Sequence, residues 1–394
     1  QFKEGVAPSE IVATRSGNAL ILSIVGTTDR VQISDFFYGQ NPRSAYNPIQ
    51  QARFADGTVW DVQALTNKYF EGSAADDALV GTVADDMIYG QGGNDTLYGG
   101  LGNDTLDGGA GNDTLYGESG NDTYLFGKGD GQDTIASDYD TSAGKLNVLQ
   151  FKEGVAPSEI VATRSGNALI LSIVGTTDRV QISDFFYGQN PRSAYNPIQQ
   201  ARFADGTVWD VQALTNKYFE GSAADDALVG TVADDMIYGQ GGNDTLYGGL
   251  GNDTLDGGAG NDTLYGESGN DTYYFSRGFG VDTVYDYDTT TGNKDVAQFA
   301  ADIASDQLWF RRNGINLEVS VIGSTDKMTI SSWYSGTSYQ IEQFRAGDGK
   351  NLSNTQVQVL VEAMASFSPP AAGQSVLSPD YKNSLDAVIS ASWK

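Results

Sequence analysis

The chain has 394 residues and a formal net charge of −28, from 23 basic and 51 acidic side chains, and it contains neither histidine nor cysteine. This composition excludes Ser-His-Asp and Cys-His catalysis, imidazole or thiolate zinc sites, and disulfides. Such an acidic chain repels nucleic-acid phosphates and anionic lipid head groups, whereas it attracts cations, so we expect no nucleic-acid partner.

The first 71 residues read as a β-rich module. Antiparallel strands are predicted over Ile11–Arg15, Leu20–Val25 and Val31–Phe37. The Asp-Gly pair within Phe54–Trp60 indicates a hairpin, and Asp61 is a predicted N-cap of a short helix that ends at Phe70. The loop Tyr38–Pro48 is expected to face solvent, with partner binding as the alternative. Because large apolar side chains are usually buried, we expect core positions for Phe36, Phe37, Trp60 and Phe70.

A period of nine residues begins at Gly72. Gly99-Gly-Leu-Gly-Asn-Asp104-Thr-Leu106 shows it well: glycines, then an aspartate, then an apolar residue two places later. The period places aspartates at Asp77, Asp86, Asp95, Asp104, Asp113 and Asp122, with a weaker seventh register at Asp133.

Each nonapeptide reads as a six-residue turn followed by a three-residue strand with one inward apolar side chain, since glycine permits the positive φ angles of such turns. Two nonapeptides would form one coil of a parallel β-roll, so residues 18 apart would stack at about 4.8 Å. Asp95 would then lie above Asp113, and Asp104 above Asp122.

Each nonapeptide buries only one Leu-sized side chain, and the free energy gained by that burial is smaller than the entropic cost of ordering the backbone of nine residues. Stacked carboxylates also repel each other. A hard divalent cation between coils reverses that repulsion, and calcium fits best because it accepts six to eight oxygens in loose geometry, whereas magnesium demands a tight octahedron. The sequence therefore predicts that the roll forms only with calcium.

Two other interpretations of these aspartates are open. Gly-Asn-Asp runs are common in flexible polar turns, and the Asn-Asp-Thr triplets match N-glycosylation acceptors, although neither explains an apolar residue at every ninth place.

Two further pairs of aspartates lie outside the nonapeptides, in Asp138–Asp140 and Asp286–Asp288. They have the spacing of an EF-hand loop without its glycine and glutamate, and are predicted to be solvated turns.

The chain is a tandem array. Residues 1–124 recur unchanged as 150–273, and a divergent third copy begins at Phe299. Because Gln1 corresponds to the middle of a predicted strand, we expect the sequence to be the C-terminal part of a longer protein. A helix is predicted over Thr355–Phe367, and an amphipathic stretch over Ser378–Lys394.

The predicted fold class is all-β: two parallel β-roll blocks alternate with antiparallel β-rich spacer modules and end in a short helical tail. The predicted segments are modules at 1–71, 137–220 and 286–367, rolls at 72–136 and 221–285, and a linker with the tail at 368–394. A module can cover the open end of a roll, which otherwise exposes strand edges.

The nonapeptides resemble those of the RTX (repeats-in-toxin) family, whose G-G-x-G-x-D-x-U-x repeat binds calcium, and the spacers resemble RTX-associated domains. The resemblance implies calcium sites between registers 18 apart: Asp95 with Asp113, Asp104 with Asp122, Asp244 with Asp262, and Asp253 with Asp271. Turn carbonyls would complete them, at Gly93, Gly102, Gly111, Gly120, Gly242, Gly251, Gly260 and Gly269.

Further sites would depend on Asp77, Asp86, Asp133, Asp226, Asp235 and Asp282. Here the chain departs from the family pattern: Ala75 and Ala84 replace a glycine, and Lys128 places a cation near the seventh register. The family geometry allows about ten ions in the chain.

The resemblance also implies a role. The module would fold on binding calcium after secretion, and its uncleaved C-terminal tail would be read by a type I secretion apparatus, which suits a cysteine-free chain. The protein would be secreted, with any contact to a host membrane or surface made by upstream regions. No catalytic residue is expected, although carboxylate dyads for glycoside hydrolysis stay an alternative. The parent protein would be a haemolysin-like RTX toxin, or else an adhesin or surface-layer protein, or a hydrolase with this export tail.

Overall fold

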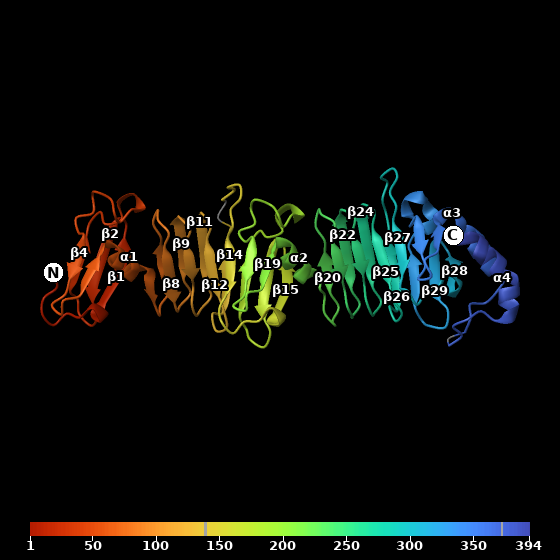
Figure 1. Ribbon diagram of the computed structural model, residues 1–394, viewed down its shortest axis with the longest axis horizontal. Coiled ribbons are helices and arrows are strands. Elements are labelled where there is room, and N and C mark those ends of the chain that lie inside the picture. The colour runs from red at the N-terminus through yellow and green to blue at the C-terminus, as the bar shows by residue number, and fades with distance from the viewer. Residues whose placement is uncertain (138–139, 372) are drawn as a thin grey trace. The chain divides into compact units, whose positions relative to one another are not determined.

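A computed structural model describes residues 1–137, 140–371 and 373–394. It divides into two compact units, Gln1–Leu214 and Thr215–Lys394, which we describe one by one. Strands dominate both units (Figure 1). The predicted all-β fold class, with parallel roll blocks, antiparallel modules and a helical C-terminal tail, is confirmed.

The N-terminal module contains an antiparallel sheet of order β1-β2-β3, a hairpin of β4 with β5, and one α-helix. The predicted strand over Val31–Phe37 is too long. Asp35 adopts a left-handed φ of 57°, which turns the chain out of the sheet after Ile33. The bounds are β1 (Ile11–Ser16), β2 (Ala19–Ile24), β3 (Arg30–Ile33), β4 (Gln51–Arg53), β5 (Val59–Asp61) and α1 (Val62–Phe70).

The helix and most of the core of this module agree with the sequence. Asp61 is confirmed as the N-cap, since its Oδ1 accepts a hydrogen bond from the backbone N of Ala64 at 2.8 Å. Trp60 is wrong as a core residue: it lies half-buried on the short hairpin, where its ring packs edge-on against Phe54 with centroids 4.7 Å apart. The core prediction is confirmed for Phe36, Phe37 and Phe70.

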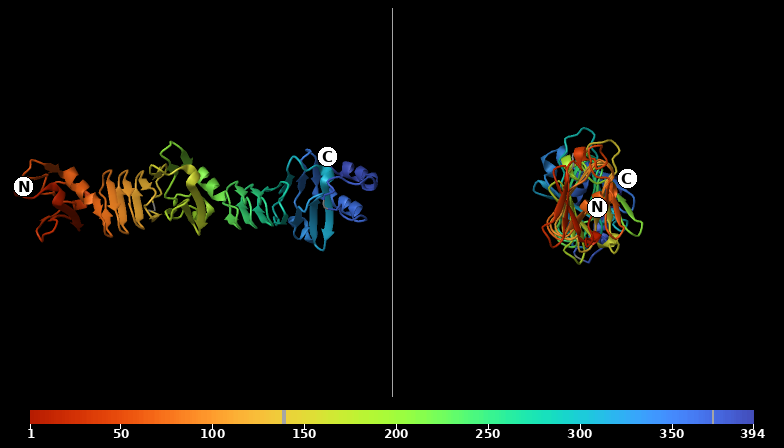
Figure 2. Two further views of the ribbon diagram at one scale, coloured as in Figure 1. Left: turned by 90° about the horizontal axis from the view of Figure 1, so that it is seen from below. Right: turned by 90° about the vertical axis from the view of Figure 1, so that its left-hand side faces the viewer.

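The first roll consists of short parallel strands that stack 18 residues apart, as predicted. Thr105 pairs with Thr123 in one sheet, and Thr114 with Thr96 in the other. Figure 2 shows these stacked strands. Their bounds are β6 (Glu71–Ser73), β7 (Ala78–Val80), β8 (Met87–Gln91), β9 (Thr96–Leu101), β10 (Thr105–Asp107), β11 (Thr114–Ser119), β12 (Thr123–Phe126) and β13 (Gln132–Ile135). The inward residues are all buried: Leu79, Ile88, Leu97, Leu106, Leu115, Tyr124 and Ile135.

The second copy of the module covers the C-terminal end of this roll by extending its sheets. β14 pairs in parallel with β12, and β17 with β13, so the orders run β19-β18-β14-β12-β10-β8-β6 and β15-β16-β17-β13-β11-β9-β7. The strand edges of the roll are thereby satisfied. The bounds are β14 (Val148–Phe151), β15 (Ile160–Ser165), β16 (Ala168–Ile173), β17 (Arg179–Ile182), β18 (Gln200–Arg202), β19 (Val208–Asp210) and α2 (Val211–Phe219).

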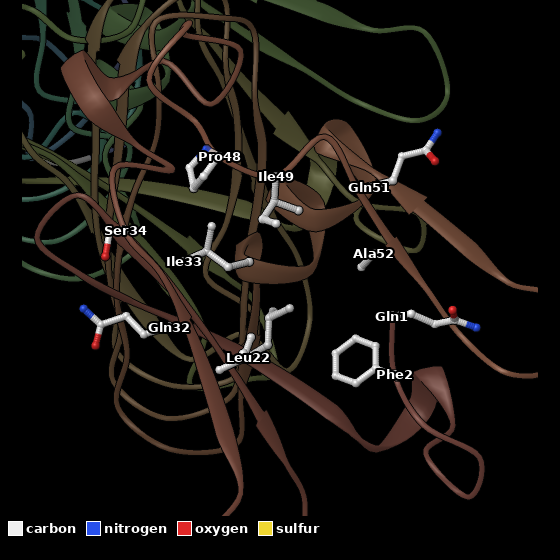
Figure 3. Close-up of a pocket in the computed structure, with 11 residues that line it drawn as sticks. Gln1, Phe2, Leu22, Gln32, Ile33, Ser34, Pro48, Ile49, Gln51 and Ala52 are labelled. Carbon is white, nitrogen blue, oxygen red and sulfur yellow. The ribbon is translucent and has the colours of Figure 1, made fainter.

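The two copies of the module in this unit show what the contact with a roll covers. In the second copy Val180 is 1% exposed, whereas in the first its identical counterpart, Val31, is 50% exposed. The same face of the first copy lines a cavity of about 480 Å³, with Phe2, Leu22 and Ile33 around it (Figure 3). The module therefore carries an apolar face that fits the last coil of a roll.

The second unit repeats this architecture. Its sheet orders are β20-β22-β24-β26-β30-β29-β28 and β21-β23-β25-β27-β31-β32. The third module thus extends the second roll as the second module extends the first. The bounds are β20 (Ala227–Val229), β21 (Met236–Tyr238), β22 (Thr245–Leu250), β23 (Thr254–Asp256), β24 (Thr263–Ser268), β25 (Thr272–Phe275), β26 (Val281–Tyr285), β27 (Val296–Phe299), β28 (Leu308–Asn313), β29 (Asn316–Val321), β30 (Lys327–Ile330), β31 (Gln343–Arg345) and β32 (Asn351–Ser353).

The C-terminal tail is folded against the third module. The two predicted helical stretches are confirmed as α3 (Asn354–Met364) and α4 (Pro379–Ser392). The backbone of Lys394 exchanges two hydrogen bonds with Asn351, at 2.7 and 2.8 Å. The apolar face of α4 and the residue after it are buried through Leu385, Ile389 and Trp393.

Candidate metal centre

The turns of the rolls need glycine. At Gly120 the backbone φ is +136°, and a β-carbon there would overlap the carbonyl oxygen of Gly102 in the previous coil. Gly108 has no room for a side chain either, because a β-carbon there would overlap Oδ2 of Asp113. The glycines therefore let successive turns stack closely and bring carbonyl and carboxylate oxygens together.

The aspartates form a continuous ladder. Oδ1 of Asp95 accepts a hydrogen bond from the backbone N of Asp77 at 2.7 Å, and Oδ1 of Asp113 accepts from Asp95 at 2.7 Å. In the alternate turn, Oδ1 of Asp104 accepts from Asp86, and Oδ1 of Asp122 from Asp104 at 2.9 Å. The predicted stacking of aspartates 18 residues apart is confirmed. The same ladder joins Asp226, Asp244, Asp262 and Asp282 on one side, and Asp235, Asp253 and Asp271 on the other.

The second oxygen of most of these carboxylates is buried without a donor. Within residues 1–137, 140–371 and 373–394, Oδ2 has no hydrogen-bond partner in Asp95, Asp104, Asp113, Asp133, Asp244, Asp253 and Asp262. These residues are only 1% or 2% exposed. A buried polar atom without a partner carries its full desolvation cost, and a buried charge carries more. The ladder therefore has the form of a site that needs a cation.

Burial sets the electrostatics of the ladder. Burial, with a smaller contribution from neighbouring carboxylates, raises the pKa of Asp104 to about 8 and that of Asp95 to about 6, although hydrogen bonds from backbone N–H groups oppose the shift. An ion-free ladder therefore disfavours its own charge. Burial likewise raises the pKa to about 8 in Asp133, Asp253 and Asp282, to about 7 in Asp271, and to about 6 in Asp244.

The donor set fits calcium. It consists of carboxylate and carbonyl oxygens, which are the ligands of hard cations. Nowhere in the described part of the chain do three or more acidic side chains gather as metal ligands, so an ion in the rolls would take much of its shell from the backbone. The carbonyls of Gly93 and Gly102 face the next coil at Gly111 and Gly120, as a shared shell requires. The individual ligands, including all eight glycine carbonyls, stay predictions.

The first two registers of each roll differ from the later ones. Oδ2 of Asp77 accepts hydrogen bonds from the backbone N and the hydroxyl of Ser73, at 2.7 and 2.8 Å, and Oδ2 of Asp86 accepts in the same way from Thr82. Ser222 and Thr231 do this for Asp226 and Asp235. These four aspartates stay predictions as ligands, but protein donors already reach them. In the sequence, these registers can be told from the later ones by a Ser or Thr in place of the second glycine of the nonapeptide.

The cation near Asp133 is Lys152, whereas the sequence predicted Lys128. Lys128 forms an ion pair with Glu159 at 2.8 Å. Instead Nζ of Lys152 lies 2.7 Å from Asp107 and 2.8 Å from an oxygen of Asp130. Its charge lowers the pKa of Asp133, although burial outweighs it. The nine-residue period does not indicate Lys152, because this residue follows β14 and lies outside the nonapeptides.

The prediction of solvated turns is wrong for Asp286. This residue is 3% exposed and continues the alternation of β26, in which Asp282 and Val284 are buried. Asp288 does cap a turn: its Oδ1 accepts a hydrogen bond from the backbone N of Thr290 at 2.7 Å. In the equivalent segment of the first unit, Asp138 and Tyr139 lie outside the described residues.

Known families match both kinds of segment. The haemolysin-type calcium binding protein related domain matches the modules, at residues 20–64, 169–213 and 316–356. The RTX calcium-binding nonapeptide repeat matches the rolls, at 71–106, 98–135, 220–255 and 247–282.

Individual relatives are matched over parts of the chain. The iron-regulated protein FrpA of Neisseria meningitidis serogroup C is 35% identical over 91 residues, which are 22% of this chain and 8% of that protein. The extracellular lipase LipA of Serratia marcescens is 18% identical over 66% of this chain and 36% of LipA, with a TM-score of 0.22. The AlgE6R3 subunit of the Azotobacter vinelandii mannuronan C5-epimerase is 27% identical over 27% of this chain and 71% of that subunit, with a TM-score of 0.21.

Across the described residues, every helix is too short or too polar to cross a membrane. The nonapeptide matches coincide with the ladder of buried aspartates, and the matches to the related domain coincide with the modules. The chain therefore belongs to the RTX calcium-binding repeat proteins.

Proposed function

We propose that the chain is a calcium-dependent folding and export module of a larger secreted, haemolysin-like RTX protein. In a calcium-poor cytosol the acidic chain stays unfolded, and outside the cell calcium orders each roll. The observation that carries this proposal is the ladder of buried carboxylate oxygens without donors, in Asp95, Asp104, Asp113, Asp133, Asp244, Asp253 and Asp262. Its chemistry is ion ligation and folding, with no turnover of a substrate.

The packing of the rolls supports dependence on the ion. Each nonapeptide buries one inward apolar side chain, such as Leu97 or Leu106, while its turn buries a carboxylate. Metal binding that is coupled to folding adds its binding free energy to the stability of the fold. Each site saturated at a hundredfold over its dissociation constant would add about 2.7 kcal/mol.

The folded tail bears on when it can be recognised. Leu385, Ile389 and Trp393 are buried against the third module. Trp393 packs on Phe310, with ring centroids 6.3 Å apart. A secretion apparatus that reads this tail would therefore meet it before the module folds, which agrees with export of an unfolded chain.

The proposal is tested by deleting residues 378–394 in a producing cell that has a type I apparatus. We expect the truncated protein to stay inside the cell. Because α4 packs on the third module, the truncation will also weaken that module, so the folding of the first roll in calcium is measured separately on purified protein and should be unchanged. Secretion of the truncated protein at the normal level would overturn the export role and leave calcium-dependent folding untouched.

A repeat region of an adhesin or surface-layer protein is the second candidate for the parent. The exact recurrence of residues 1–124 as 150–273 favours it, since a long array is built by such copying. Many more copies in the full-length protein would support this candidate over the haemolysin-like one.

A further inference from the structure

The C-terminal end of the second roll contains a buried pair of carboxylates that belongs to no nonapeptide. Asp286 follows β26, and Asp295 precedes β27. They are 3% and 1% exposed, and their side chains lie within hydrogen-bond reach of each other. Two carboxylates at this distance need a proton or a cation between them.

Three oxygens here have no donor in the described residues: Oδ1 of Asp286, Oδ2 of Asp295 and Oδ1 of Asn293. Asn293 also shares a side-chain hydrogen bond with Asp295, so its amide is held at the pair. Glu342, just before β31, accepts a hydrogen bond from the backbone N of Asp295 at 2.9 Å. The oxygens of the pair thus come from the segments around β26 and β27, beside a carboxylate from the third module.

The charge at this place is uncompensated. Burial, together with the neighbouring charges of Asp295, Glu342 and Asp271, raises the pKa of Asp286 to about 9. Burial also raises the pKa of Glu342. The pair therefore holds either a shared proton or a bound cation at neutral pH.

The first roll shows that the hydrogen bonds of this end do not require carboxylates. There Asn147 takes the place of Asp295: its Oδ1 accepts from the backbone N of Asp122 at 2.8 Å, as Asp295 does from Asp271 at 2.7 Å. Gln199 takes the place of Glu342 and accepts from the backbone N of Asn147 at 2.8 Å.

The change from amides to carboxylates thus adds two acidic groups, the buried Asp295 and the half-buried Glu342, and gains no backbone hydrogen bond. At Asn147 the atom left without a partner, within the described residues, is Nδ2, which is a donor and repels a cation. At Asp295 the partnerless atom is instead an oxygen, Oδ2.

We propose that the second roll binds a further calcium ion at its C-terminal end, between Asp286 and Asp295, with Oδ1 of Asn293 as an additional ligand. All the ligands are oxygens, which calcium prefers, and the two charges of the ion balance those of the pair. The ion would join the end of β26 to the start of β27, beside the segment that leads into β31. The proposal rests on the proposed calcium-dependent folding and adds one calcium ion outside the nonapeptides of the second roll.

The test counts calcium ions on the full chain. Wild type and variants are stripped of metal, dialysed against saturating calcium and measured by mass spectrometry of the metal and by amino-acid analysis. Asp286→Asn should bind one ion fewer per chain than wild type. Asp288→Asn removes a like charge from the same loop, outside the pair, and should bind the full number.

A second variant keeps the test decisive if Asp286→Asn folds poorly. Asp295→Asn combined with Glu342→Gln copies the end of the first roll, where amides make the same hydrogen bonds, and it should also lose one ion. Adding Asp286→Asn to that variant should remove no further ion, because the residues share one site.

An unchanged ion count in Asp286→Asn would overturn the proposal. So would an infrared band of a protonated carboxyl group in calcium-saturated wild type that disappears in Asp286→Asn, since it would show that the pair holds a proton. Wild type that stays unfolded at every calcium concentration would instead refute the proposed function.

Discussion

The two rolls have identical sequences from Gly72 to Tyr124 and from Gly221 to Tyr273, yet they end differently. The first ends on the amides of Asn147 and Gln199, and the second on the carboxylates of Asp295 and Glu342. The same backbone hydrogen bonds are made in both. These amides and carboxylates differ in charge, so two copies of one repeat can depend on calcium to different degrees.

A second difference lies beside the seventh register. In the first unit Lys152 forms ion pairs with Asp107 and Asp130. In the second unit Ala300 and Phe279 take the places of Lys152 and Asp130, and the ring of Phe279 is 2% exposed. The first roll therefore carries a cation of its own at this end. The second has an aromatic contact there and leaves its acids to be neutralised by bound ions.

The largest expected effect comes from breaking one ladder. Replacing both Asp104 and Asp113 with Ala removes carboxylates from adjacent sites of the first roll. We expect the variant to lose about half of the calcium-induced change in far-UV circular dichroism, because each roll folds as its own cooperative unit. Asp253→Ala combined with Asp262→Ala is the matched change in the second roll.

Hydrogen exchange locates the loss. Residues 125–137 and 274–285 differ in sequence between the rolls, so their peptides can be told apart. Protection should fall in the first range for the first variant and in the second range for its match. Equal loss in both ranges for either variant would show that the rolls are not independent.

A smaller effect is expected from pH in calcium-free buffer. The raised pKa values mean that the folded ladder binds protons that the unfolded chain releases, since an unperturbed Asp titrates near 3.9. This stabilisation is fully present below about pH 4 and is lost as the pH rises through about 8, the value for Asp104 and Asp253. Acid should therefore partly replace calcium, and circular dichroism should show more β structure at pH 5 than at pH 8.

The two ends sharpen this prediction. Because the pKa of Asp286 is about 9, the stabilisation of the second roll by bound protons should persist to higher pH than that of the first roll. The double variant Asp295→Asn with Glu342→Gln copies the end of the first roll. It should narrow the pH range over which bound protons stabilise the second roll. A chain that loses structure as the pH falls from 8 to 5 would contradict the sign of these shifts.

The smallest effect concerns Lys152. Lys152→Met removes the cation of the first roll. We expect it to lower the free energy of unfolding by about 1 kcal/mol at limiting calcium, which is the upper end of the range for partly exposed ion pairs. The cost should shrink at saturating calcium, since bound ions replace the lost charge. Lys128→Met, which breaks only the outer pair with Glu159, is the control. An equal cost at both calcium concentrations would show that Lys152 acts by packing.

The repeat itself could be predicted from the sequence. Nine-residue periodicity gave the parallel strands, the inward Leu97 and Leu106, and the stacking of Asp95 on Asp113, because a period fixes which residues are neighbours in a roll. Local rules were enough for the helix N-cap at Asp61.

The ends of the rolls could not be predicted in this way, because the period stops there. The ladder steps 25 residues from Asp122 to Asn147 and 24 from Asp271 to Asp295. Lys152 and Asp286 reach the rolls only through these irregular steps. Ser73 and Thr82 were missed for another reason: a hydroxyl group at the second position looks like ordinary turn chemistry until its distance to the carboxylate is known.

The most direct test of the account is the structure of the full chain without ions. Far-UV circular dichroism and small-angle scattering are recorded at pH 8 in chelator and then in excess calcium. We predict an expanded, largely unordered chain in chelator that becomes compact and rich in β structure on adding calcium. Rolls that are already ordered and compact in chelator would contradict the claim that bound ions hold them together.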